Sequence, residues 1–105
     1  MRQFSPQELQ EYLATAEQQP LLLDVREKWE YEICALPNSV LIPMGHIVER
    51  IDELPTDKTI VVICHHGVRS MQVALYLVKN GLDVVNLKGG VDAWARDVDK
   101  TMASY

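Results

Sequence analysis

The sequence predicts a single three-layer α/β domain, with a mostly parallel sheet of four or five strands flanked by helices. Short apolar runs alternate with segments of helical periodicity, which is the pattern of parallel strands joined by crossover helices. The runs are apolar throughout, as in strands that are covered on both faces. The 105 residues show no linker or internal repeat. We therefore assign residues 1–105 to one domain.

The first predicted helix covers about residues 6–18. Ser5 can cap this helix, Pro6 suits the first helical position, and Glu8 completes a capping box. Apolar side chains then recur at steps of three and four residues, which indicates an amphipathic helix. Residues 2–4, ahead of this helix, are expected to add a short edge strand.

The remaining strands and helices alternate along the chain. The predicted strands are residues 21–25, 39–42, 60–64 and 84–87. The predicted helices are residues 29–33, 45–53, 69–79 and 91–96. Gly81 suits the left-handed position that ends the third of these helices. Ligand sites of open parallel sheets lie beyond the carboxyl ends of the strands, so we expect the site at residues 24–26, 43–46, 64–69 and 88–90.

The composition excludes several classes of partner. Hydrophobic residues make up 48% of the chain, charged residues 24%, and the formal net charge is −5. A mildly acidic domain is a poor candidate for binding nucleic acid or an anionic membrane surface. The apolar runs fall far short of the about 20 residues that a membrane span needs, and the N-terminus has no apolar signal-peptide core. Two cysteines do not form a disulfide framework, so we expect a reducing, cytoplasmic environment.

The segment Cys-His-His-Gly-Val-Arg-Ser at residues 64–70 carries the strongest chemical signal. Cys64 ends the most apolar strand, and the most regular helix begins at Arg69. A loop this short turns its amides inward, and Gly67 supplies the backbone freedom that such a turn needs. The helix N-terminus adds a partial positive charge. The arrangement favours the thiolate form of Cys64 and would bind an anion attached to its sulfur.

Cys-x-x-Gly-x-Arg after a buried strand resembles the active-site loop of the rhodanese family of sulfurtransferases. Two further segments occur in the family's order: residues 22–31 resemble its first signature and residues 86–94 its last. The resemblance covers about residues 4–96 and implies the rhodanese-like fold. A Gly-His-Ile-x-Gly-Ala stretch that often follows the first signature is missing from residues 33–39, which puts the local turn shape in doubt.

The resemblance implies a two-step transfer of sulfur. Cys64 takes a sulfane sulfur from a small-molecule donor such as thiosulfate, and the resulting persulfide passes it to cyanide, a small thiol or a protein cysteine. No cofactor is expected. The amides expected to bind the persulfide are those of His65, His66, Gly67, Val68 and Arg69.

Three charged residues are expected to support this loop. Arg69 either points at the incoming anion or folds back and braces the loop. By analogy with the family, Asp24 and Arg26 brace the carboxyl edge of the sheet through ion pairs, with Glu30 as a candidate partner of Arg26.

Two other functions stay open at this point. A phosphatase or arsenate reductase can be built on the same fold, but the resembling phosphatases carry one more residue between the cysteine and the arginine, and the tighter loop here suits a single sulfur atom. A non-catalytic binding module is the third hypothesis, and the presence of Cys64 argues against it.

Two neighbouring features are interpreted without special chemistry. No metal is expected at His65 and His66, because a site needs three or four ligands and adjacent residues rarely share one ion. Cys34 is interpreted as a small core residue rather than as a disulfide partner of Cys64.

Overall fold

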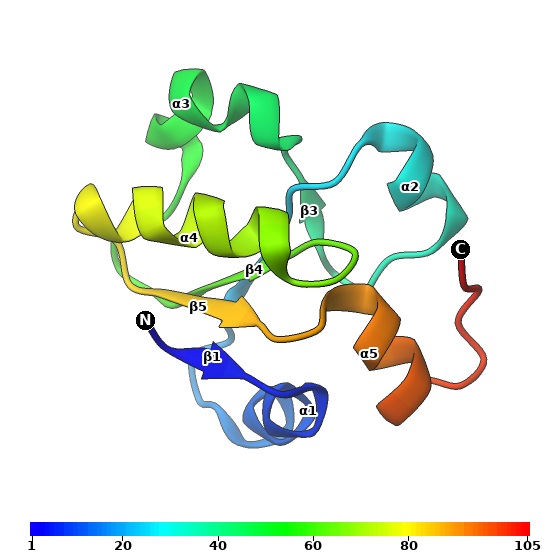
Figure 1. Cartoon of the computed structure of the whole chain (residues 1–105). Helices are drawn as coiled ribbons and strands as arrows, with labels where there is room; N and C mark the ends of the chain where they lie inside the picture. Colours follow the sequence, from blue (N-terminus) through cyan, green and yellow to red (C-terminus); the bar gives the residue numbers. More distant parts are fainter.

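A computed structural model describes all residues from 1 to 105. Its five strands form one sheet in the order β1-β5-β4-β2-β3 (Figure 1). The strands are β1 (Gln3–Phe4), β2 (Leu21–Asp24), β3 (Val40–Leu41), β4 (Ile60–Ile63) and β5 (Val84–Leu87). All four pairings are parallel. The predicted fold class is confirmed, and the expected edge strand pairs with β5.

The helices follow the expected order. They are α1 (Pro6–Thr15), α2 (Lys28–Ile33), α3 (Ile47–Arg50), α4 (Val68–Lys79) and α5 (Gly90–Asp97). Ser5 caps α1 in a complete capping box with Glu8. None of these helices is both long enough and apolar enough to cross a lipid bilayer.

Two helices differ from the prediction. α1 ends at Thr15 rather than near residue 18. The Gln19 side chain donates to the carbonyl groups of Leu13, in the last turn, and of Ala16, the C-terminal cap. The helix predicted at residues 45–53 is divided into a 3₁₀ turn, the short α3 and a second 3₁₀ turn. Hydrogen bonds between residues three apart tighten both ends of this segment, as is usual for 3₁₀ geometry.

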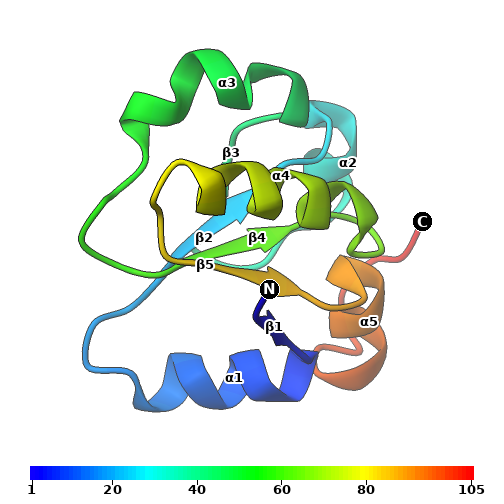
Figure 2. The ribbon, with the colours of Figure 1, turned by 60° about the vertical axis from the view of Figure 1, so that its left-hand side comes forward.

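The sheet separates two apolar cores. Helices α3 and α4 cover one face, and α1 and α5 cover the other (Figure 2). In β4, Ile60 and Val62 point to the core under α3 and α4, whereas Val61 and Ile63 point to the opposite core. All four side chains are 0% exposed. Burial on both faces explains why this strand is apolar at every position.

The carboxyl end of β4 is held between two helix N-termini. α4 begins shortly after β4, and the first residues of α5 donate from Val91 N to Cys64 O at 2.9 Å and from Asp92 N to His65 O at 3.0 Å. Gly90, at a φ of +59°, leaves no space for a side chain against the main chain of Cys64 and His65. The loop that follows β4 is therefore fixed to α5 by main-chain contacts.

Gly90→Ala tests this close packing. The added Cβ would overlap the main chain of Cys64 and His65 at a backbone conformation that favours glycine, so we expect a loss of roughly 2–4 kcal/mol in the free energy of unfolding. Urea denaturation of both proteins measures the difference. The matched control is Gly45→Ala, where the new methyl group meets nothing within 4 Å and should change stability by less than about 0.5 kcal/mol. Equal effects of the two substitutions would contradict the packing argument.

Candidate active site

The loop from Cys64 to Gly67 connects the central strand β4 to α4. Gly67 is the N-terminal cap of α4 and has the left-handed φ of +93°. Its carbonyl accepts a hydrogen bond from Asn86 Nδ2 of β5 at 3.2 Å. A Cβ at Gly67 would lie 3.0 Å from Gly89 N. The curl of the loop thus depends on glycine, as the sequence predicts.

Three polar groups converge on the Cys64 sulfur. Gly67 N donates to Sγ at 3.1 Å and Ser70 N donates at 3.3 Å. The thiol lies 3.2 Å from Ser70 Oγ and donates to it. In the thiolate form the Ser70 hydroxyl can rotate and donate instead, so three donors would then surround the negative sulfur.

Ser70 is the main residue that the motif-based prediction missed. Of the amides expected at residues 65–69, only that of Gly67 donates to the sulfur, and the second amide belongs to Ser70. Ser70 is fully buried in the first turn of α4. The first N–H groups of a helix have no partner within the helix, so a serine three residues into this helix was the available signal.

The Arg69 side chain folds back and pairs with α2. Its guanidinium binds both carboxylate oxygens of Glu30 on α2, at 2.7 and 2.9 Å. The expected pairing of the Arg26 side chain with the Glu30 carboxylate is wrong. Arg26 instead binds the Asp24 carboxylate, at 2.7 Å for the shortest contact, and reaches only the Glu30 main-chain carbonyl. Glu30 is therefore free to pair with Arg69.

Glu30 and Arg26 are joined by Tyr105 near the end of the chain, which lies beside α2 (Figure 1). The Tyr105 hydroxyl donates to Glu30 Oε2 at 2.8 Å and accepts from Arg26 Nη1 at 3.0 Å. Hydrogen bonds from Arg69 lower the pKa of Glu30 to about 2, against burial, which raises it. Burial raises the pKa of Tyr105 to about 12. The carboxylate is ionised and the phenol is neutral at pH 7.

The side chains outside the sulfur pocket form an aromatic layer. The Tyr105 ring stacks on His65 with a centroid distance of 3.8 Å and an interplanar angle of 7°. The His65 ring is also stacked with His66 at 3.9 Å. Burial, and then the neighbouring His66, lower the pKa of His65. Cys64 itself is 1% exposed.

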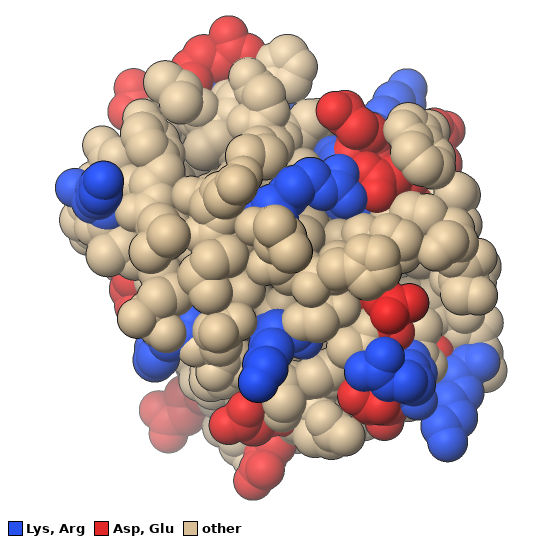
Figure 3. All heavy atoms as spheres, viewed as in Figure 1, with Lys and Arg blue, Asp and Glu red and all other residues tan.

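The other features noted in the sequence are Val68, Cys34 and the surface charge. Val68 is the first residue of α4, and its side chain is exposed. Cys34 is a half-buried free thiol whose sulfur lies 3.9 Å from Arg26 Nη1. Acidic and basic side chains are interspersed on the face seen in Figure 3. That face therefore offers no large patch of one charge to attract a partner.

The fold and the loop define a class of α/β protein that presents a cysteine at the mouth of a helix. The family description "Rhodanese-like domain" matches residues 5–97. The chain belongs to this family. It is 40% identical over 77 residues to a protein of Allochromatium vinosum named "Sulfurtransferase", covering 72% of each chain.

Two further comparisons agree with this assignment. The chain is 39% identical over 82 residues to "Thiosulfate sulfurtransferase GlpE" of Pseudomonas syringae, covering 77% of each chain. The crystal structure of a rhodanese-like domain protein from Staphylococcus aureus superimposes with a TM-score of 0.84 at 34% identity, over 90% of this chain and 91% of that one. The comparisons support sulfurtransferase activity in general.

The Glu30–Arg69 pair predicts a dependence of stability on acid pH. The pKa of Glu30 is about 2 in the folded protein against an ordinary 4.5. The pair therefore contributes fully above about pH 4.5, and its contribution is lost as the pH falls toward 2. Glu30→Gln should lower the free energy of unfolding at pH 7 by roughly 1–3 kcal/mol, and the difference from the wild type should shrink between pH 5 and pH 2. Urea titrations across this range provide the measurement.

The matched control for this prediction is Glu53→Gln. Glu53 forms a similar two-bond pair with Arg50, but on the exposed surface, where ion pairs contribute little to stability. A difference between Glu30→Gln and the wild type that stays constant from pH 7 to pH 2 would contradict the assignment.

Proposed function

We propose that the protein is a sulfurtransferase that carries a sulfane sulfur on Cys64. The proposal rests on three groups that converge on Cys64 Sγ, namely Gly67 N, Ser70 N and the Ser70 hydroxyl. Main-chain donors that are already oriented stabilise developing negative charge without reorganisation. A sulfur nucleophile and its persulfide both carry that charge.

The reaction balances without a cofactor or an external oxidant. The Cys64 thiolate attacks the outer sulfur of thiosulfate, a new S–S bond forms at Sγ, the S–S bond of the donor breaks, and sulfite leaves with the bonding electron pair. A thiophilic acceptor then attacks the outer sulfur, and the thiolate is restored. Thiosulfate as the donor is supported by the name of the Pseudomonas syringae relative. The acceptor is a small thiol or a protein cysteine, and the cytoplasm is the compartment in which such thiols stay reduced.

The loop favours sulfur transfer over phosphatase chemistry. The resembling phosphatases carry one more residue between the cysteine and the arginine than the four present here. The tighter loop suits a single sulfur atom, and the guanidinium of Arg69 is held by both carboxylate oxygens of Glu30.

Sulfur loading of Cys64 can be observed directly. After incubation with thiosulfate, intact-mass spectrometry should show a gain of one sulfur atom, and cyanide should remove it. Cys64→Ser should show no gain, whereas Cys34→Ser, the other free thiol, should load as the wild type does. Turnover of an aryl phosphate without loading would instead indicate a phosphatase, and the absence of both reactions would indicate a binding module.

Arg69→Ala should keep the fold and slow sulfur loading by about tenfold, which corresponds to about 1.4 kcal/mol. The expected reason is that Arg69 lies next to Ser70, and its pair with Glu30 holds the start of α4 against α2. Stopped-flow loading kinetics measure the rate, and circular dichroism checks the fold. The control is Arg50→Ala, which breaks a surface pair. Loading by Arg69→Ala at the wild-type rate would exclude this role.

A further inference from the structure

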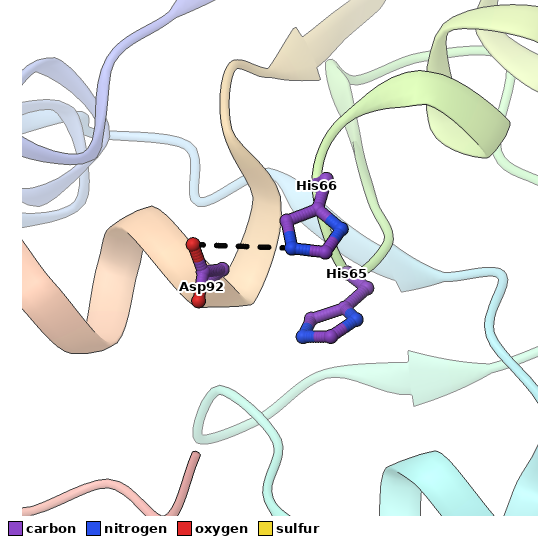
Figure 4. A group of neighbouring side chains, drawn as sticks. All are labelled: His65, His66 and Asp92. Atoms are coloured by element: carbon purple, nitrogen blue, oxygen red, sulfur yellow. Dashed lines mark ion pairs between the residues drawn. The ribbon is translucent and has the colours of Figure 1, made fainter. Parts of the chain in front are cut away.

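Three metal-binding side chains meet at the outer rim of the Cys64 loop. His65 and His66 come from the loop, and Asp92 comes from the first turn of α5. One ligand atom of each lies within 4.8 Å of the other two. His66 Nε2 is 4.0 Å from Asp92 Oδ2, and Figure 4 shows the His66 ring facing that carboxylate with the His65 ring beside it. The third candidate ligand, which the sequence pattern did not indicate, is thus Asp92 of α5.

The main chain that carries these groups is rigid. Asp92 N donates to His65 O at 3.0 Å, so the residues that provide the imidazole and the carboxylate are joined directly. Tyr105 and His66 both stack on the His65 ring, at 3.8 and 3.9 Å. Two rings cannot occupy the same face, so His65 lies between them and its orientation is restricted. Tyr105 thus holds one face of the His65 ring, whereas the exposed His66 ring has to turn before its nitrogen can point at a shared ion.

The donor set matches one class of ion. Two imidazole nitrogens and one carboxylate oxygen are the set that binds Zn²⁺ with a fourth position open. Hard cations such as Mg²⁺ prefer oxygen ligands alone. Bond lengths of about 2.1 Å in a tetrahedral site place ligand atoms about 3.4 Å apart, so the present groups have to approach by about 1 Å. The side chains of His66 and Asp92 are 61% and 42% exposed and can rotate to do this.

The competing contact at Asp92 is weak. Arg96 Nη1 lies 3.7 Å from Asp92 Oδ2, and the arginine side chain is 66% exposed. Exposed pairs of this kind contribute little to stability. None of the three metal-binding side chains donates to or accepts from the Cys64 sulfur. An ion could therefore bind here without removing a hydrogen bond from the sulfur.

We propose that His65, His66 and Asp92 form a binding site for a divalent transition-metal ion of the Zn²⁺ type at the rim of the Cys64 loop. Two residues of the loop and one of α5 supply the ligands, and the fourth position faces away from the protein ligands toward a water molecule or an anion. This site does not depend on the proposed sulfur transfer.

Titration of the whole chain with Co²⁺ tests the proposal, because tetrahedral Co²⁺ absorbs visible light and reports its ligands. We expect a single ion per chain, displaced by Zn²⁺ and not by Mg²⁺. His66→Asn and Asp92→Asn should each weaken Co²⁺ binding at least tenfold. The matched control is His46→Asn, which removes the only other histidine, an exposed side chain paired with Glu49, and should bind Co²⁺ as the wild type does.

Three results would overturn the site. They are the absence of Co²⁺ binding, binding that survives both His66→Asn and Asp92→Asn, and an intense thiolate-to-cobalt absorption that disappears in Cys64→Ser. The last result would mean that the ion is held by the cysteine instead. Both tested side chains are exposed, so the variants should fold, and circular dichroism verifies this before each titration.

Discussion

The loop after β4 has to turn its amides toward one sulfur atom, and much of the surrounding structure serves this constraint. The turn requires a left-handed residue at Gly67, and main chain packs against main chain where the loop meets Gly89 and Gly90. A side chain at Gly67 or Gly90 would meet main-chain atoms across this contact. The N-terminus of α4 then brings its free amides to Cys64. Because main-chain groups hold the sulfur, its surroundings depend on backbone shape more than on the identity of neighbouring side chains.

A buried charge network connects this loop to distant parts of the chain. Asp24 and Arg26 are completely buried as a pair, and Glu30 binds both Arg69 and Tyr105. Buried ion pairs add little net stability compared with apolar residues, but the loss of one partner is costly. The network therefore acts mainly to fix positions: it holds α2 and the end of the chain against the loop.

The two histidines of the loop show how one segment can serve two surfaces. Their main chain belongs to the curl around the sulfur, while their rings lie on the outer side with Tyr105 and Asp92. The proposed sulfur transfer uses the inner surface, and the proposed ion uses the outer one. α5 contributes to both, because its first amides hold the loop carbonyls and Asp92 faces the rings. A substitution at the start of α5 would therefore alter both surfaces.

By itself, the sequence determined the parallel α/β fold, the positions of β4, β5 and α4, and the places of Cys64 and Gly67 in the loop between β4 and α4. These features depend on apolar runs, helical periodicity and glycine conformation, which are properties of neighbouring residues. Only the tertiary structure decided that Arg69 pairs with Glu30, 39 positions away, that Tyr105 reaches Glu30 across 75 positions, and that Asp92 lies beside His66. Several carboxylates and cations were available to each charged group, and the packing of α2, α5 and the chain end selects among them by distance. Ser70 was missed for a similar reason, because the direction of its amide depends on how α4 is placed against the end of β4.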